Sequence, residues 1–314
     1  MKKLKLILSL LVLIGITTSC DDFLSEVPDN RTQLDTPEKI SEILVNAYPD
    51  ASYMEFAETM SDNAFDSENL TGTTTKNSQN YNWEELDDVQ RDTPAFYWDA
   101  CYAAIAHANQ ALEAIDKLGN PANLKAQRGE ALMARAYSHF MLVSIFSQRY
   151  NPATAKTDLG IPYILEPETV LLKKYTRNSV EEVYANLEKD IELGLQLVGD
   201  DYNQPKFHFN KAAAKAFASR FYLVKGNWDK VLANSDDLSS QPDGKLRSIA
   251  GYNLLDTTTR FNIYSQASEN SNLLVVSTSS LYNRTIRSNR FGLTGAERNT
   301  VFGAATNLFN KTWL

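Results

Sequence analysis

The sequence predicts an all-α fold made of helical hairpins, with long loops and a small irregular or β-containing C-terminal segment. Three observations predict it. Apolar residues recur at steps of three and four over several long stretches, which is the period of a helix with one buried face. Short breaks at residues 119–121 and 226–227 separate neighbouring helices, so the helices on either side form antiparallel pairs. Residues 241–314 lose this period and are rich in Asn, Ser, Thr and Gly.

A short helix and a long loop region are expected before the first hairpin. The helix begins at Thr36, with Pro37 in the first turn, where a missing N–H costs nothing. Residues 48–50 end it. Residues 50–92 are predicted to be irregular because polar runs interrupt any apolar period, and loops of this length are often functional.

Two long helices are expected next. The first begins at Pro94 and carries Trp98, whose ring we expect in the core. It ends at residues 119–121, where Asn120 is expected to cap a second helix that runs to Phe146. The tight turn between them predicts an antiparallel hairpin.

A second series of helices follows a loop. Ser179 and Glu182 have the spacing of a capping box for the first of them. Another helix begins after Asn210 and ends at Gly226, and a short one begins with Trp228, also expected in the core. Helix pairs in series are typical of a tetratricopeptide-like solenoid.

The C-terminal residues differ from the rest of the chain. Residues 273–278 (Leu-Leu-Val-Val-Ser-Thr) are rich in β-branched side chains and predict a strand. The remainder of residues 241–314 offers no obvious core of its own. We therefore expect this part to be irregular.

The first 19 residues have the layout of a secretory signal peptide. Three lysines precede an apolar run of 11 residues at positions 6–16, and small residues follow. A helix needs roughly 20 apolar residues to span a bilayer, so a permanent transmembrane anchor is not expected.

Cys20 follows the signal directly and is the expected site of lipidation, because a bacterial lipoprotein carries its diacylglycerol on such a thiol. The alternative is a plain secreted protein with a chance cysteine. Residues 20–35 are polar and are expected to be a tether. Asp21 and Asp22 indicate export to the outer face of the outer membrane, or are simply part of a solvated linker.

The net charge of the chain disfavours a nucleic-acid-binding protein. The net charge is −8, and removal of the signal, which holds three lysines and no acidic residue, makes it −11. Such a surface repels nucleic acid, and no basic stripe is present in the sequence. Apolar residues make up 43%, which is enough for a core.

No motif for catalysis or metal binding is recognisable. Cys101, the only other cysteine, lies on an apolar helix face and is expected to be a buried thiol. His107, His139 and His208 are scattered and lack the spacing of metal ligands. We expect no catalytic residue, no metal and no cofactor, which disfavours a lipid-anchored hydrolase.

Several segments in the same order resemble the SusD/RagB family of outer-membrane nutrient-binding lipoproteins. They begin with Cys20 to Leu24. The first hairpin contributes Trp98-x₃-Tyr102-x₂-Ile105-x₂-Ala108-Asn109-x₂-Leu112 and Glu130-Ala131-x₃-Arg135-Ala136-Tyr137. The later segments are Gly160-Ile161-Pro162-Tyr163, Arg177-x-Ser179-Val180-x-Glu182-Val183-Tyr184 followed by Asp190, Lys211 to Ala214, Arg220-x-Tyr222-Leu223 and Gly226-x-Trp228.

The resemblance implies a fold and a function. It implies a tetratricopeptide-like helical domain over residues 36–240, followed at 241–314 by the beginning of an irregular SusD/RagB C-terminal region. Family members are longer than 314 residues, so we expect a truncated form or a fragment. The implied function is non-catalytic: capture of a nutrient, above all a glycan, for a SusC-like TonB-dependent β-barrel transporter. A protein-interaction scaffold without glycan binding is the alternative.

Candidate ligand contacts lie in the predicted loop region. Aromatic rings stack on sugar faces, and amides and carboxylates satisfy hydroxyls, so Tyr81, Asn82 and Trp83 have suitable chemistry. In an extended strand Tyr81 and Trp83 would share one face. The alternative for Trp83 is packing of the loop onto the helices. Asp62 and Asn63 are expected either to bind ligand or to cap a turn.

Overall fold

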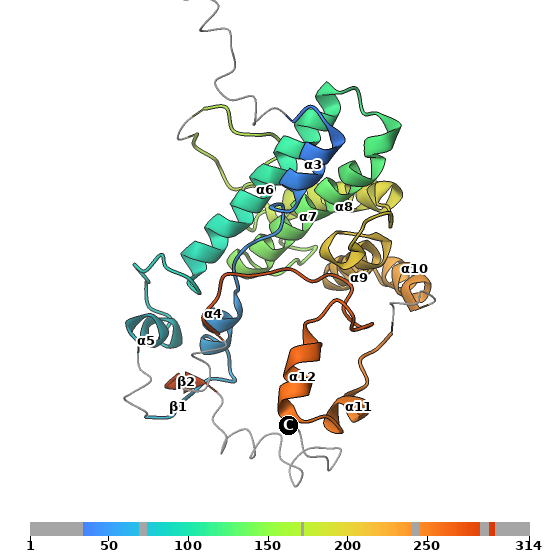
Figure 1. Ribbon diagram of the computed structural model, residues 1–314. Coiled ribbons are helices and arrows are strands. Elements are labelled where there is room, and N and C mark those ends of the chain that lie inside the picture. Colours follow the sequence, from blue (N-terminus) through green and yellow to red (C-terminus); the bar gives the residue numbers. More distant parts are fainter. Residues whose placement is uncertain (1–33, 69–73, 171–172, 240–244, 283–288, 293–314) are drawn as a thin grey trace, which may run out of the picture. The chain divides into compact units, whose positions relative to one another are not determined.

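The computed structural model describes residues 34–68, 74–170, 173–239, 245–282 and 289–292 (Figure 1). The chain divides into two units at the bond between residues 35 and 36, and the second unit contains the elements described below. The predicted signal peptide and Cys20 lie outside the described residues. No helix in the described part of the chain is both long and apolar enough to cross a membrane.

The structure is mostly helical, as predicted, and its strands form one two-stranded sheet among the described residues. The elements before the second helix series are α3 (Pro37–Leu44), α4 (Met54–Thr59), β1 (Phe65–Asp66), α5 (Thr75–Tyr81), α6 (Pro94–Lys117), the 3₁₀ turn η3 (Ala122–Leu124) and α7 (Lys125–Phe146). The later elements are α8 (Val180–Leu197), the 3₁₀ turn η4 (Pro205–Phe207), α9 (Lys211–Lys225), α10 (Trp228–Ser239), α11 (Ile249–Asn253), α12 (Thr257–Tyr264) and β2 (Phe291–Gly292).

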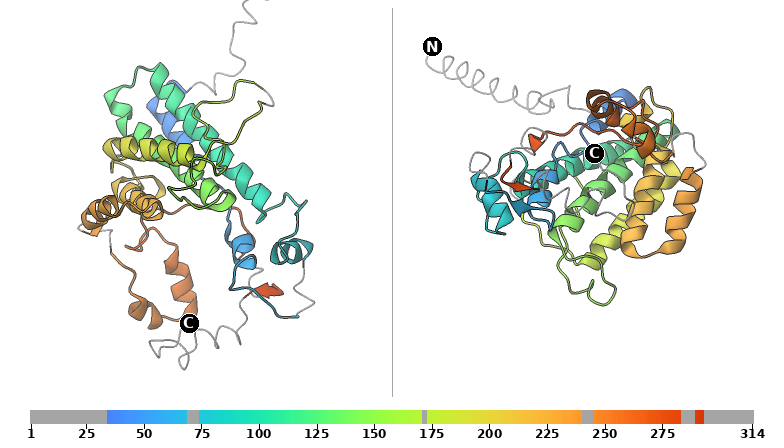
Figure 2. Two further views of the ribbon diagram at one scale, coloured as in Figure 1. Left: turned by 180° about the vertical axis from the view of Figure 1, so that it is seen from behind. Right: turned by 90° about the horizontal axis from the view of Figure 1, so that it is seen from below.

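Helix α7 is the centre of the core. It packs against α6 on one side and α8 on the other, and also contacts α3 and α9 (Figures 1 and 2). Its residues are therefore buried around most of its circumference, including Met133, Phe140 and Leu142. Helices α9 and α10 form a further antiparallel hairpin. Together these pairs confirm the predicted stack of helical hairpins.

Two glycines set the spacing between α7 and α8. A Cβ atom at Gly129 would lie 2.4 Å from the backbone nitrogen of Val198, and one at Gly194 would lie 2.6 Å from the Sδ atom of Met133. No side chain larger than hydrogen fits at the first position without moving backbone. The two helices consequently approach more closely than larger side chains would allow.

The predicted helix ends agree with the structure at several points. The Thr93 hydroxyl caps α6, with Pro94 in the first turn, and Ser179 forms its capping box with Glu182. Asn210 caps α9, which ends at Gly226 with φ +81°. Each cap satisfies backbone groups that a helix end leaves without partners.

Asn120 does not cap the second long helix, contrary to the prediction. It has φ +55° in the turn after α6, and η3 intervenes before α7 begins. Its side-chain oxygen instead accepts a hydrogen bond from Arg128. The turn needs a residue that tolerates the left-handed conformation, and asparagine meets that need.

The region 50–92 was predicted to be irregular, yet it contains α4, β1 and α5. Strand β1 pairs in antiparallel register with β2, so that Phe65 is opposite Gly292. Helices α4 and α5 contact each other and β2 (Figure 1). These short elements depend on this mutual packing, because isolated helices of one or two turns are unstable.

Residues 273–278 do not form the predicted strand. They run as an extended segment in which the Val275 amide donates to the Lys206 carbonyl at 2.7 Å, without a ladder of paired residues. The segment then reaches the start of α6, where the Leu281 amide donates to the Asp92 carboxylate at 2.7 Å. A β-branched run alone does not make a strand when no neighbouring edge pairs with it.

Candidate functional site

A buried ion pair joins the two central helices beneath the candidate site. The Arg135 Nε and Nη2 atoms of α7 each lie 2.7 Å from a carboxylate oxygen of Asp190 on α8. The Nη1 atom of the same guanidinium donates to the Asn109 side-chain oxygen on α6 at 2.9 Å. Two-point pairing of this kind fixes both side chains in one geometry. Arg135 thereby connects three helices.

The ion pair and Asn109 form hydrogen bonds with the segment at residues 160–168. Asn109 donates to the Ile164 carbonyl at 3.0 Å, and Arg135 donates to the Leu165 carbonyl at 3.1 Å. The Tyr163 hydroxyl donates to Asp190 at 2.7 Å. Asn109, Arg135, Tyr163 and Asp190 all occur in the motifs found in the sequence. Their shared task in this structure is to attach the 160–168 segment to the helices.

His139 completes this attachment as a neutral imidazole. Its ring stacks on Tyr163 with 3.8 Å between centroids, and its Nε2 atom accepts from the Ile164 amide at 3.0 Å. Nε2 therefore carries no proton, and Nδ1 donates to the Arg135 carbonyl at 2.9 Å. Complete burial lowers the pKa of His139 to about 3.

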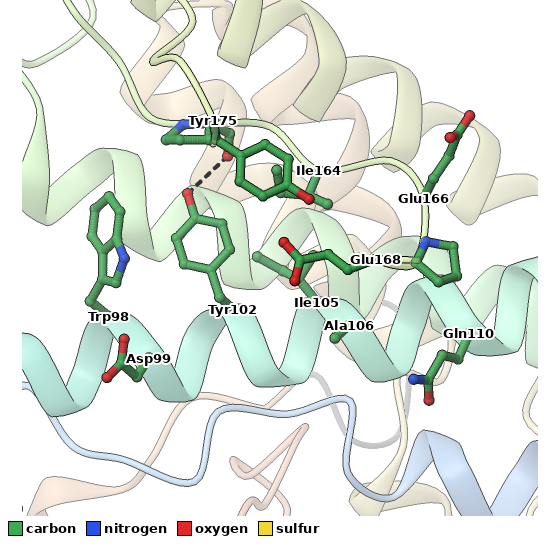
Figure 3. A pocket seen from close by; sticks show the side chains of 12 residues that line it. Trp98, Asp99, Tyr102, Ile105, Ala106, Gln110, Ile164, Glu166, Glu168 and Tyr175 are labelled. Atoms are coloured by element: carbon green, nitrogen blue, oxygen red, sulfur yellow. Dashed lines mark hydrogen bonds between the residues drawn. The ribbon is translucent and has the colours of Figure 1, made fainter. Parts of the chain in front are cut away.

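An aromatic cleft of about 480 Å³ lies between α6 and this attached segment (Figure 3). Trp98 and Tyr102 are one turn apart on α6 and point into it, while Tyr175 faces them from the other wall. The lining residues are Trp98, Asp99, Tyr102, Ile105, Ala106, Gln110, Pro162, Ile164, Glu166, Pro167, Glu168 and Tyr175.

The rings of the cleft are held in place. Tyr102 donates from its hydroxyl to the Pro162 carbonyl at 2.9 Å, and the Trp98 ring packs edge-on against Phe146 with 5.0 Å between centroids. The Tyr175 ring on the opposite wall is 37% exposed, and desolvation together with its interaction with Glu168 raises its pKa to about 12. These rings form a wall that needs little rearrangement to receive a ligand.

Trp98 was expected in the core, and the structure corrects that expectation. Its ring is only partly buried and lines the cleft. Tyr175 and Glu168 belong to no motif that is recognisable in the sequence. The sequence feature that indicates the cleft is the four-residue spacing of Trp98 and Tyr102, which places both rings on one face of a helix. The proline-containing segment after Gly160 packs beside that face. Trp228 was also expected in the core but is 63% exposed at the start of α10.

Trp83 is the most exposed tryptophan side chain among the described residues, with 71% of its surface accessible. Its backbone has φ +57°, an uncommon conformation for a bulky side chain. The alternative in which this ring packs the loop onto the helices is therefore wrong. Backbone strain of this kind is concentrated at functional sites, and it costs of order 1–3 kcal/mol.

Tyr81 and Trp83 do not share the face of an extended strand. Helix α5 continues through Tyr81, and Asn82 ends it as the C-cap. The Tyr81 ring turns inward and stacks on Phe291 of β2 with 4.4 Å between centroids. Only Asn82 and Trp83 of the three are exposed.

Asp62 and Asn63 lie in the turn between α4 and β1, and both are exposed. The Asn63 amide donates to the Ser61 hydroxyl at 3.2 Å. Because α4, α5 and β2 contact one another and β2 pairs with β1, this turn and Trp83 belong to one group of short elements. We call the exposed residues Asn82 and Trp83 the Trp83 face, and Asp62 and Asn63 are exposed elsewhere in the same group of short elements.

Cys101 is a buried free thiol, as predicted. Burial raises its pKa to about 12, so it is not a reactive thiolate. In the described part of the chain, no three His, Cys, Asp or Glu side chains form a group that could hold a metal ion.

A stack of helical hairpins with an aromatic cleft beside its first long helix defines a helical scaffold of the tetratricopeptide-like class. The chain belongs to the SusD-like family described as starch-binding and associating with the outer membrane, whose sequence profile matches residues 22–223. No curated protein matches the chain.

Solved structures of this superfamily have the same fold. A SusD superfamily protein from Bacteroides thetaiotaomicron is 21% identical, with 68% of this chain and 47% of that chain covered and a TM-score of 0.56. A putative sugar-binding protein from Bacteroides vulgatus is also 21% identical, with 77% and 54% covered and a TM-score of 0.60. A laminarin-binding SusD-like protein is 20% identical, with 70% and 47% covered and a TM-score of 0.51. The chain spans about half the length of these structures.

Proposed function

We propose that this chain captures a glycan at the Trp83 face and passes it to a SusC-like TonB-dependent β-barrel transporter in the outer membrane. The single observation that carries the binding site is Trp83, whose ring is 71% exposed on a backbone with φ +57°. Family membership supports a carbohydrate as the ligand.

The chemistry of the Trp83 face suits a sugar ring. The C–H groups of a pyranose form an apolar face that covers an indole and releases its water. The Asn82 amide, next to Trp83 in the chain, supplies an acceptor and donors for hydroxyl groups, and Asn63 and Asp62 are proposed to contact further units of the glycan.

The proposed position in the cell follows from Cys20. A diacylglycerol on its thiol, with a further acyl chain such as palmitate, supplies more than one chain, which stable anchoring requires. The tether at residues 20–35 reaches at most about 55 Å when fully extended. That length lets the helical domain remain at the membrane surface beside a transporter.

Substitution of Trp83 tests the binding site. The mature chain, made soluble by Cys20→Ser, is run on native gels that contain starch or laminarin, and its retardation is measured. Trp83→Ala should abolish any retardation, and Trp83→Phe should keep part of it. Phe261→Ala on α12 removes another exposed ring, 67% accessible, and should leave retardation unchanged. Equal retardation of wild type and Trp83→Ala would overturn the assignment of the site.

A protein-interaction scaffold is the second candidate function. Exposed apolar side chains on the α9–α10 hairpin favour it, namely Leu223, Val224, Trp228 and Leu232. The lipidated protein is used to retain partners from detergent-solubilised outer membranes. Retention of a large β-barrel without any glycan binding would favour the scaffold, and loss of both signals would contradict both functions.

A further inference from the structure

The aromatic cleft between α6 and the 160–168 segment differs in chemistry from the Trp83 face. Three rings, those of Trp98, Tyr102 and Tyr175, line it, with Tyr102 between the other two (Figure 3). The Glu168 carboxylate points in between Tyr102 and Tyr175. The faces of aromatic rings carry negative partial charge and attract a cation, with tryptophan the strongest.

The ionised side chains of the lining are all acidic. They are Asp99, Glu166 and Glu168, and no described lining residue is Lys, Arg or His. Figure 3 shows Glu168 aimed inward, whereas Glu166 points away from the rings. The cleft therefore offers one carboxylate that is directed toward the rings, that of Glu168, and this side chain is exposed.

Two basic side chains lie close to the cleft, and each has its own interactions. Arg177 donates to the backbone carbonyls of Gly160, Leu159 and Phe146. The Lys173 Nζ atom lies 5.1 Å from the centroid of the Tyr175 ring. The second contact shows that this ring accepts an ammonium group at its face.

We propose that this cleft binds a small organic cation, an alkylammonium or quaternary ammonium group, held by Trp98, Tyr102 and Tyr175 with Glu168 as its counter-ion. The site is separate from the Trp83 face and does not rest on glycan binding there. The group has two sources, a free small amine or the amino group of a sugar unit.

The volume agrees with such an occupant. A cleft of about 480 Å³ lies within the range of small-molecule pockets, so it has room for the cationic group together with the rest of the molecule that carries it. A neutral ligand of the same shape gains the burial but neither the attraction of the ring faces nor that of the Glu168 carboxylate. The cleft should therefore discriminate by charge rather than by shape.

Titration with matched probes tests the proposal. Choline is compared with 3,3-dimethyl-1-butanol, a neutral molecule of the same shape, and glucosamine with N-acetylglucosamine. Intrinsic tryptophan fluorescence and calorimetry report binding to the mature Cys20→Ser chain. We expect at least one cation to bind about tenfold more tightly than its neutral counterpart. Choline alone would indicate a free amine, and glucosamine alone an amino sugar.

Variants locate the binding. Glu168→Gln keeps the shape and should weaken the cation about fivefold, while Tyr175→Leu removes a ring and should weaken it at least as much. Glu113→Gln changes a carboxylate on α6 that pairs with Lys117 outside the cleft, and should leave affinity unchanged. Equal affinity for charged and neutral probes, no binding of either cation, or full affinity in Glu168→Gln would overturn the proposal.

Discussion

Arg135 and Asp190 form a buried two-point ion pair that joins α7 to α8 at 2.7 Å for both contacts. The pair does more than connect the helices, because Asn109 and Tyr163 also bind to it. Through these partners it positions the 160–168 segment, which forms one wall of the aromatic cleft. This ion pair in the core therefore fixes the position of one wall of the cleft.

Removal of one partner of this pair should be strongly destabilising. Asp190→Ala leaves the Arg135 charge buried without its counter-ion, and we expect a loss of about 3–5 kcal/mol in the free energy of unfolding. Urea unfolding followed by circular dichroism measures it. Asp116→Asn breaks the more exposed pair with Arg128 and should cost at most about 1 kcal/mol. Similar losses in the two variants would contradict this role of the pair.

His139 should make stability depend on pH. Its pKa in the folded protein is about 3, below the unfolded value of about 6.5, so its contribution is complete above pH 6.5. Between about pH 6.5 and pH 3, the unfolded chain binds a proton at His139 that the folded chain does not bind. The free energy of unfolding therefore falls as the pH is lowered through this range. The loss attributable to His139 is up to about 4–5 kcal/mol.

The variant His139→Gln isolates that contribution, because glutamine does not titrate. Unfolding free energies of both proteins are measured between pH 7 and 4, and the difference between them is plotted against pH. The wild-type protein should lose more stability than the variant over this range. Parallel curves would show that His139 is not a buried neutral imidazole.

The two glycines between α7 and α8 should respond differently to alanine. Gly129→Ala forces a Cβ atom against the backbone of Val198 and should destabilise by about 1–3 kcal/mol. Gly194→Ala meets the flexible side chain of Met133, and alanine is the better helix former, so its cost should be smaller. Thermal unfolding of both variants checks the order. An equal or reversed order would show that the helices separate easily.

Replacement of Trp83 by glycine should separate stability from binding. Glycine adopts φ +57° without strain, so Trp83→Gly should increase the free energy of unfolding by between about 0 and 1 kcal/mol. Glycan binding should be lost at the same time. A variant that loses several kcal/mol would indicate that the indole supports the fold instead.

Much of the helical scaffold could be predicted from local sequence. Thr93 with Pro94, Ser179 with Glu182, and Gly226 mark helix ends through hydrogen bonds made within a few residues. Such signals need no knowledge of the tertiary structure. The recurrence of apolar residues at steps of three and four likewise predicts helices α6, α7, α8 and α9 from the sequence alone.

The candidate sites were harder to predict because exposure depends on the tertiary structure. Trp98 and Trp228 occupy helical motif positions that suggest burial, yet one lines a cleft and the other is exposed. Helix α5 forms through contacts with β2, which lies more than two hundred residues away along the chain. The inward turn of Tyr81 onto Phe291 follows from that long-range contact.

Calorimetric titration of the mature Cys20→Ser chain with a panel of soluble neutral glycans decides whether Trp83 forms a glycan-binding site. We expect saturable heat with at least one glycan, and complete loss of that heat in Trp83→Ala with an unchanged unfolding transition. Heat that persists undiminished in Trp83→Ala, or no heat with any glycan while the chain is folded, would contradict it.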